Sequence, residues 1–422
     1  MLNFRNLNMK NKILYNFRIS YLLLFFFSGG GLFLTSCNND EDVSGAAPII
    51  ERVRFTDPAT ADSAFTKGTL GSTLVVVGQN LASTSMVYMN DYPININPEY
   101  ATETHLIVTV LDSVPTVATT PNLPHTLRVI NPFGEAVISF ETLPPAPRIE
   151  QISNTLAKAG DKITLYGSYF FFVDTVFFPG DVYTIEGIST SANGGSMSVT
   201  IPEGFDPQEG DLDIFVSSES GNSSASRNTR FYDGNGMITN FDDINRVAYW
   251  GEITNTAVGI EPIDGNFNLI NMPIPGSYGW NEKKALHFTD WDYTDGSWWT
   301  NFTPTTKYDS TIAISNFEIK MEMAVVTTSL EGLSMFLVVY DASGAEIQTS
   351  SVLADYIQST DGTWYTLSIP LNGLGLSEYG DLTKGRADGN NSFRLILQKT
   401  TEGDSDHAVI AYDNVRIQNV VD

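Results

Sequence analysis

The sequence predicts an all-β protein built from two small tandem β-sandwiches followed by a larger β-sandwich. Short runs of β-branched and aromatic residues alternate with glycine, proline and asparagine along most of the chain, and helical periodicity is nearly absent. A segment of the first half of the chain recurs further along it, and the composition changes abruptly after residue 233. A chain of 422 residues is long enough for several domains that each bury a core.

The charge balance excludes one large class of partner. The chain carries 49 acidic residues against 23 lysine and arginine residues, a formal net charge of −26, and it has no basic cluster after residue 18. Such a charge repels phosphate backbones and anionic lipid heads, so we exclude nucleic-acid binding. The single cysteine, Cys37, cannot form an internal disulfide, a zinc cage or a redox pair.

The first 36 residues have the order of a signal peptide. Four basic residues and no acidic one precede the apolar run 21–27, and small residues follow it. This run is shorter than the roughly 20 residues that a membrane-spanning helix needs. Residues 34–37 (LTSC) resemble the lipobox of bacterial lipoproteins, which implies cleavage before Cys37 and lipidation of its thiol. We therefore predict a lipoprotein signal peptide over residues 1–36.

An acidic segment follows the predicted lipidation site. Residues 38–42 (NNDED) resemble the export signal that directs Bacteroidetes lipoproteins to the outer face of the outer membrane. The alternative is a solvated acidic tether without a signal. We predict a tether over residues 37–47 and a lipid-anchored protein displayed on the cell surface.

An internal repeat divides the next part of the chain into two modules. Residues 71–81 recur as residues 160–170, an offset of 89 residues, and residues 86–89 fall on residues 175–178 at the same offset. Self-similarity over such a length indicates homologous structural units. We therefore predict two copies of one β module.

The length of each copy, about 90 residues, and the spacing of its strands fit an immunoglobulin-like sandwich. The pattern of a glycine, a β run, a second glycine and then a large apolar residue resembles the IPT/TIG family, in which the second glycine, here Gly78 and Gly167, ends a strand. We predict one such domain over residues 48–145 and another over residues 146–232. The prolines of residues 144–147 predict a stiff spacer between them.

The last part of the chain, residues 233–422, contains all six tryptophans. Residues 317–323 and 393–398 alternate apolar and polar side chains, which predicts strands buried on one face. Residues 362–371 and 411–417 look like the late strands of jelly-roll carbohydrate-binding modules. A third and larger sandwich, of jelly-roll type, is therefore predicted.

The combination of features is more specific than any one motif. A lipoprotein leader, tandem IPT/TIG modules and a tryptophan-rich jelly roll together resemble the surface glycan-binding proteins of Bacteroidetes polysaccharide utilisation loci. The resemblance implies non-catalytic capture of a neutral polysaccharide of the β-glucan or hemicellulose type. It also implies, as partners, a TonB-dependent transporter, its companion lipoprotein and a surface endo-glycanase.

Tryptophan suits this chemistry because a pyranose ring presents C–H bonds on its faces and hydroxyls at its edge. In residues 286–293, strand alternation puts Leu286 and Phe288 on one face and Trp291 and Tyr293 on the other. The acids and glycine of the loop that follows disfavour burial of its tryptophans, although one of the adjacent pair is a core residue in the alternative interpretation. We predict that the glycan site contains Trp280, Trp291, Tyr293, Trp298, Trp299 and Trp364.

The sequence also bears on metal binding. Jelly-roll binding modules commonly hold a structural calcium ion, and the resemblance points to Asp242 and Asp413 as its ligands, with solvated carboxylates as the alternative. The four histidines are scattered without metal-ligand spacing.

Two other classes of function stay open. A glycoside hydrolase needs two carboxylates at a fixed separation, and the candidates around Glu402 and Asp404 suit a hairpin turn better. A structural adhesin does not need six tryptophans in its distal domain. We therefore predict a binding protein in which residues 48–232 serve as a spacer that makes no contact with sugar.

Overall fold

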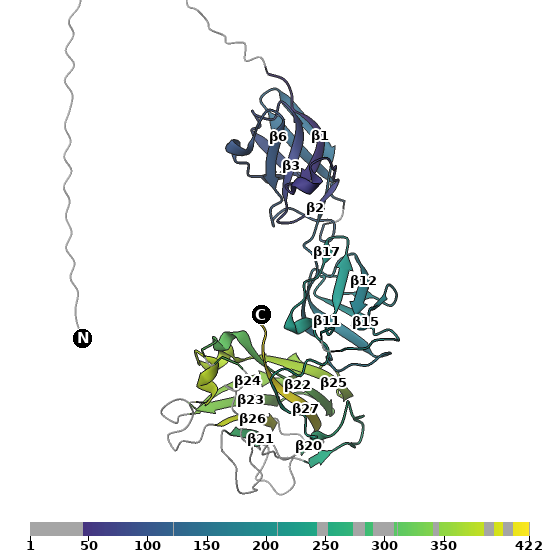
Figure 1. The fold of residues 1–422 in the computed structure, drawn as a ribbon, viewed down its shortest axis with the longest axis vertical. Coiled ribbons are helices and arrows are strands. Elements are labelled where there is room, and N and C mark those ends of the chain that lie inside the picture. The colour runs from purple at the N-terminus through teal and green to yellow at the C-terminus, as the bar shows by residue number, and fades with distance from the viewer. Residues whose placement is uncertain are drawn as a thin grey trace, which may run out of the picture. The chain divides into compact units, whose positions relative to one another are not determined.

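The computed structural model describes residues 45–120, 122–208, 210–242, 252–272, 283–289, 308–309, 311–340, 346–383, 392–399 and 408–421 (Figure 1). Residues 46–422 form one compact unit. Within the described ranges the regular structure consists of β-strands and short 3-10 helices, which confirms the all-β prediction. In the same ranges, no helix has both the length and the apolar character needed to cross a membrane.

The first module is a sandwich of two antiparallel sheets, in the orders β1-β3-β6 and β5-β4-β7-β8, with a parallel pair β2-β9 beside them. Its core contains Leu74, Leu106 and Leu127, all fully buried. Its strands are β1 (Ile49–Phe55), β2 (Lys67–Thr69), β3 (Thr73–Gln79), β4 (Met86–Met89), β5 (Tyr92–Ile94), β6 (His105–Thr109), β7 (Thr126–Asn131), β8 (Gly134–Ser139) and β9 (Glu141–Leu143).

The second module repeats this plan, with sheets in the orders β10-β11-β15-β14 and β13-β12-β16-β17. Leu165, Val176 and Val199 lie fully buried between them. Its strands are β10 (Arg148–Ile152), β11 (Lys162–Ser168), β12 (Val173–Phe178), β13 (Val182–Thr184), β14 (Ser189–Thr190), β15 (Ser196–Thr200), β16 (Phe215–Ser218) and β17 (Gly221–Asn222).

One glycine in each module explains why the repeat is visible in the sequence. Gly78 and Gly167 each lie one residue before the end of their strand. Each lies opposite a bulge in the strand that pairs with it, β1 for Gly78 and β10 for Gly167. A Cβ atom at Gly78 would lie 1.8 Å from the carbonyl oxygen of Ile49, and one at Gly167 would lie 2.0 Å from that of Arg148. No side chain fits at such a distance, so both copies require glycine there.

The larger sandwich consists of a six-stranded sheet, in the order β19-β20-β27-β22-β25 with β18 paired to β27, and a four-stranded sheet, in the order β21-β26-β23-β24. Its strands are β18 (Met237–Thr239), β19 (Glu252–Thr254), β20 (Phe267–Met272), β21 (Lys283–Thr289), β22 (Phe317–Val326), β23 (Leu333–Tyr340), β24 (Glu346–Val352), β25 (Asp361–Pro370), β26 (Ser392–Lys399) and β27 (Ala408–Asn419). The described 3-10 helices of the chain are η1 (Pro58–Thr60), η2 (Pro98–Tyr100), η3 (Arg227–Thr229), η6 (Ile314–Asn316), η7 (Leu353–Asp355), η8 (Leu371–Leu374) and η9 (Tyr379–Thr383).

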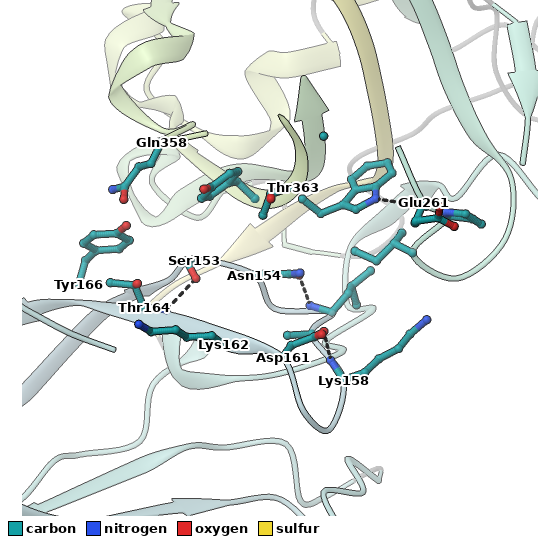
Figure 2. Close-up of a pocket in the computed structure, with 17 residues that line it drawn as sticks. Ser153, Asn154, Lys158, Asp161, Lys162, Thr164, Tyr166, Glu261, Gln358 and Thr363 are labelled. Atoms are coloured by element: carbon teal, nitrogen blue, oxygen red, sulfur yellow. Dashed lines mark hydrogen bonds between the residues drawn. The ribbon is translucent and has the colours of Figure 1, made fainter. Parts of the chain in front are cut away.

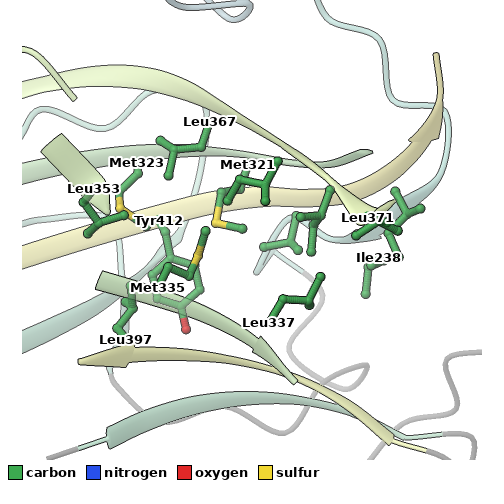
Figure 3. Packing of buried hydrophobic residues seen from close by; sticks show 14 of the residues in the cluster. Ile238, Met321, Met323, Met335, Leu337, Leu353, Leu367, Leu371, Leu397 and Tyr412 are labelled. Carbon is green, nitrogen blue, oxygen red and sulfur yellow. The ribbon is translucent and has the colours of Figure 1, made fainter. Parts of the chain in front are cut away.

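The core of this sandwich lies between its two sheets (Figure 3). Met321 and Met323 of β22 and Leu367 of β25 approach it from the six-stranded sheet, and Met335 and Leu337 of β23 approach it from the other. All five side chains are buried. Methionine and leucine suit this position because they fill the space between facing strands and carry no group that needs a hydrogen-bond partner.

The prediction that residues 317–323 form a strand buried on one face is wrong. The core-facing methionines are buried, and so are Lys320 and Glu322 on the other side of β22, which are 4% and 0% exposed. Their side of the six-stranded sheet, called here the outer face, is covered by the second module. Alternation revealed a polar face correctly, but a polar face is solvated only when no other domain packs on it.

We expect Gly167→Ala to destabilise the second module by about 1–3 kcal/mol, because the new Cβ forces β10 and β11 apart. Gly234→Ala is the matched control, since a Cβ at that position meets nothing within 4 Å. Hydrogen exchange of the β10 and β11 amides would report the free energy of opening. Equal protection in the two variants would contradict the steric explanation.

Candidate functional site

Most of the predicted glycan-binding side chains lie outside the described residues: Trp280, Trp291, Tyr293, Trp298 and Trp299. Cys37 also lies outside them, as do Glu402 and Asp404. The site that these residues form therefore stays a prediction. The described residues show instead the strands to which the undescribed segments are attached, and they include Trp364.

The framework is one end of the four-stranded sheet. Thr289, the last residue of β21, pairs with Ser392, the first residue of β26, and Tyr340 at the end of β23 pairs with Glu346 at the start of β24. The register of β23 with β26 runs toward this same end, since Leu333 pairs with Lys399 and Val338 with Arg394. The three chain segments 290–307, 341–345 and 384–391 are therefore all attached at one end of the sheet.

Leu286 of β21 pairs with Leu395 of β26, which in turn pairs with Leu337 of β23, a buried residue of the core. The side-chain directions predicted for residues 286–293 stay a prediction.

Trp364 lies on the outer face of the six-stranded sheet, in line with Ala324 and Ala411. Its side chain is 8% exposed, and its indole Nε1 donates a hydrogen bond of 2.7 Å to the carbonyl oxygen of Glu261. The ring also packs edge-on against Phe267, with 5.7 Å between centroids. The ring is packed rather than openly displayed, and its contact with a glycan stays a prediction.

The second module contacts the outer face through a buried ion pair. Arg416 of β27 and Glu322 of β22, 3% and 0% exposed, are joined by two hydrogen bonds, Nη1 to Oε2 at 2.8 Å and Nη2 to Oε1 at 2.9 Å. The hydroxyl of Thr155, from the second module, donates to Oε1 of Glu322 at 3.0 Å and accepts from Nη2 of Arg416 at 3.1 Å. A side chain of one domain thus completes an ion pair of the other.

Further polar contacts surround this pair. The backbone nitrogen of Thr366 in β25 donates to the carbonyl oxygen of Ser153 at 2.7 Å, and the amide of Gln151 donates to the carbonyl oxygen of Thr366 at 3.1 Å. Lys320 donates through Nζ to the side-chain oxygen of Asn228 at 2.8 Å. Burial lowers the pKa of Lys320 to about 8, and the nearby carboxylate of Glu318 offsets part of that effect.

Sequence reasoning did not identify these interface residues. The signal was present as charged residues at alternate positions of β22 and as polar residues at alternate positions of β27, but such residues usually face solvent. Thr155 and Arg416 are 261 positions apart in the sequence. Nothing local in either segment indicates that they meet.

A cavity of about 500 Å³ opens beside this interface (Figure 2). One wall comes from the second module and includes Lys162, Thr164 and Tyr166 of β11. The other comes from the larger sandwich and includes Gln358 and Thr363. Figure 2 shows Tyr166 and Gln358 on opposite sides of it. The volume lies within the range of about 300–1,000 Å³ that is typical of small-molecule sites.

The two carboxylates predicted to hold calcium lie in different surroundings. Asp242 is exposed, and its Oδ1 accepts hydrogen bonds from the backbone and side chain of Asn266. Asp413 is fully buried, and burial together with the neighbouring carboxylate of Asp264 raises its pKa to about 10.

Calcium takes six to eight oxygen ligands. No group of three or more His, Cys, Asp or Glu side chains within the described ranges is arranged to hold a metal ion. The calcium site therefore stays a prediction.

The larger sandwich matches a known family model. Residues 231–419 are similar to the surface glycan-binding protein B xyloglucan binding domain. Members of the family are non-catalytic binding proteins, in agreement with the prediction of a binder rather than an enzyme. The family name also agrees with the predicted location at the cell surface.

An IPT/TIG domain-containing protein of Bacteroides ovatus is 35% identical over 183 residues, which are 40% of this chain. The chain matches 37% of the length of that curated relative. The IPT/TIG resemblance of the sequence agrees with the name of this relative.

Two solved structures are similar over most of the chain. The surface glycan-binding protein PbSGBP-B of Prevotella bryantii is 20% identical, with a TM-score of 0.54, and the alignment covers 88% of this chain and 98% of that one. SGBP-B from a complex xyloglucan utilization locus in Bacteroides uniformis is 16% identical, with a TM-score of 0.46 and coverage of 88% and 99%. The first of these likenesses supports the all-β fold.

We expect Arg416→Met to destabilise the chain by about 3–5 kcal/mol, because it leaves the buried carboxylate of Glu322 without its partner. The double variant Glu322→Leu/Arg416→Met should recover most of this loss, since neither member of the pair is then left as a buried charge without its partner. Arg148→Met is the control: Arg148 pairs with Glu150 at 3.7 Å, but both side chains are mostly exposed, so its loss should cost at most about 1 kcal/mol. Urea unfolding gives the three values. Similar losses for Arg416→Met and Arg148→Met would contradict the role of the buried pair.

Proposed function

We propose that this chain captures a neutral, β-linked glucan of the xyloglucan type at the cell surface without cleaving it. The observation that carries the proposal is the match of residues 231–419 to the xyloglucan binding domain of surface glycan-binding protein B. Xyloglucan belongs to the hemicellulose class that the sequence analysis expects. The predicted lipidation of Cys37 would hold the protein at the outer membrane.

The arrangement of the strands supports a binding site at one end of the four-stranded sheet. Three chain segments are attached there, and one of them follows Thr289 and contains Trp291, Trp298 and Trp299. A rigid sheet that carries aromatic side chains on its connections loses little conformational entropy when a sugar binds. Tyr293 is proposed to extend the same surface. Trp280 precedes Lys283, at the opposite end of β21, and is proposed as a separate contact.

The other parts of the chain take supporting roles in this proposal. Residues 37–47 form the tether, residues 48–145 and 146–232 the two immunoglobulin-like domains, and residues 233–422 the binding domain. The net charge of −26 disfavours an anionic polymer such as a polyuronate. A TonB-dependent transporter, its companion lipoprotein and a surface endo-glycanase are the partners that would import and cleave the captured glycan.

We expect Trp291→Ala, Trp298→Ala and Trp299→Ala to weaken xyloglucan binding by about 2 kcal/mol or more at the central platform, roughly a 30-fold rise in Kd. Their melting temperatures should stay close to that of the wild type. Trp364→Ala is the contrasting variant, because removal of this buried ring should cost about 3–5 kcal/mol of stability. Calorimetric titration and thermal melts measure both quantities. Full affinity in the first three variants would refute the proposed site.

We also expect no catalysis. Long incubation of the purified chain with xyloglucan, mixed-linkage glucan, mannan or xylan should release no oligosaccharide, as judged by chromatography of the soluble products. A product ladder that disappears in Glu402→Gln or Asp404→Asn would instead establish the hydrolase alternative.

A further inference from the structure

We propose that the cavity between β11 and the larger sandwich is a second carbohydrate subsite, which takes a short, uncharged oligosaccharide segment. This inference rests on the proposed function, since it assigns a further part of the chain to the same class of ligand. It also revises the expectation that the second module makes no contact with sugar.

The first argument is the direction of the β11 side chains. Ile163 and Leu165 point into the core of the second module, where they are 1% and 0% exposed. Strand alternation therefore turns Lys162, Thr164 and Tyr166 to the opposite side, and all three line the cavity. One strand thus presents an ammonium group, an aliphatic hydroxyl and a phenol in a row along one wall (Figure 2).

The second argument is the hydroxyl group of Tyr166. Its oxygen is buried, and Thr164 and Gln358 are the hydrogen-bonding side chains near it. Burial raises the pKa of Tyr166, and Tyr365 adds to this, while Thr164 and Gln358 lower it. A phenol hydroxyl both donates and accepts hydrogen bonds. A ligand hydroxyl in the cavity can therefore pair with it.

The charges around the cavity favour a neutral ligand. Lys158 and Lys162 line it together with Asp161 and Glu261, so the two positive charges are matched by two negative ones. An anionic or cationic ligand would find both attraction and repulsion there. A ligand made of hydroxyl groups, each of which donates and accepts hydrogen bonds, can pair with ammonium, amide, hydroxyl and carboxylate groups alike.

The cavity also has aromatic walls. Tyr166 and Tyr365 line it, and so does Trp364 beside them. Aromatic rings next to polar groups match a pyranose, which has apolar faces and a polar edge. Because the Arg416–Glu322 pair and Thr155 hold the two walls together, the cavity exists before a ligand binds, and little binding energy is spent on ordering it.

The test separates the two sites. The triple variant Trp291→Ala/Trp298→Ala/Trp299→Ala removes the proposed main site, and calorimetry or ligand-observed NMR with xyloglucan-derived oligosaccharides then measures the binding that remains. We expect residual binding, weakened about tenfold or more when Tyr166→Phe and Gln358→Ala are added. Tyr183→Phe is the control, since Tyr183 belongs to the same module but is 61% exposed and does not line the cavity. Tyr166→Phe should melt close to the wild type, because the substitution removes one hydroxyl group and keeps the aromatic ring.

Each result decides between the proposals. Residual binding that falls with the Tyr166 and Gln358 changes, but not with Tyr183→Phe, supports the second subsite. No residual binding in the triple variant, or residual binding that these changes leave intact, overturns the subsite while the main site stands. No binding of oligosaccharide or polysaccharide by the wild-type chain overturns the proposed function and the subsite with it.

Discussion

The ion pair between Arg416 and Glu322 is the interaction on which the arrangement of the second module and the larger sandwich depends. Both side chains are almost completely removed from water. Removing two charges from water costs several kcal/mol per ion, and hydrogen bonds to the two groups offset part of that cost. Thr155 of the second module makes one such hydrogen bond to each of them. Separation of the two domains would therefore break both of these bonds.

The contact between the two small modules is of a different kind. Lys67 of the first module pairs with Glu219 of the second and with Glu141 of its own, and all three side chains are substantially exposed. Exposed ion pairs of this type contribute about 0–1 kcal/mol and weaken with salt. The prolines of residues 144–147 stiffen the connecting chain itself. One junction is thus fixed by buried charge, whereas the other depends mainly on backbone stiffness.

The sequence was informative where the determinants are local. Gly78 and Gly167 revealed the repeat because a close backbone approach in each copy excludes every other residue. The same reasoning failed for Lys320 and Glu322, since alternation reports the polarity of a face and not what packs on it. Trp364 shows the same limit, because the Glu261 carbonyl that accepts the hydrogen bond of its indole lies 103 positions away. Contacts between domains depend on pairs of distant residues, and a single sequence does not connect them.

The hydrogen bonds at Thr366 have a consequence for the behaviour of the protein at high concentration. β25 is the last strand in the order of its sheet, and such an edge offers unpaired backbone groups to any other extended chain. Ser153 and Gln151 occupy both backbone groups of Thr366, so a strand of another molecule cannot add at that point. The second module thereby blocks edge-to-edge strand pairing at this position of β25. The block matters most where many copies of the chain are crowded together.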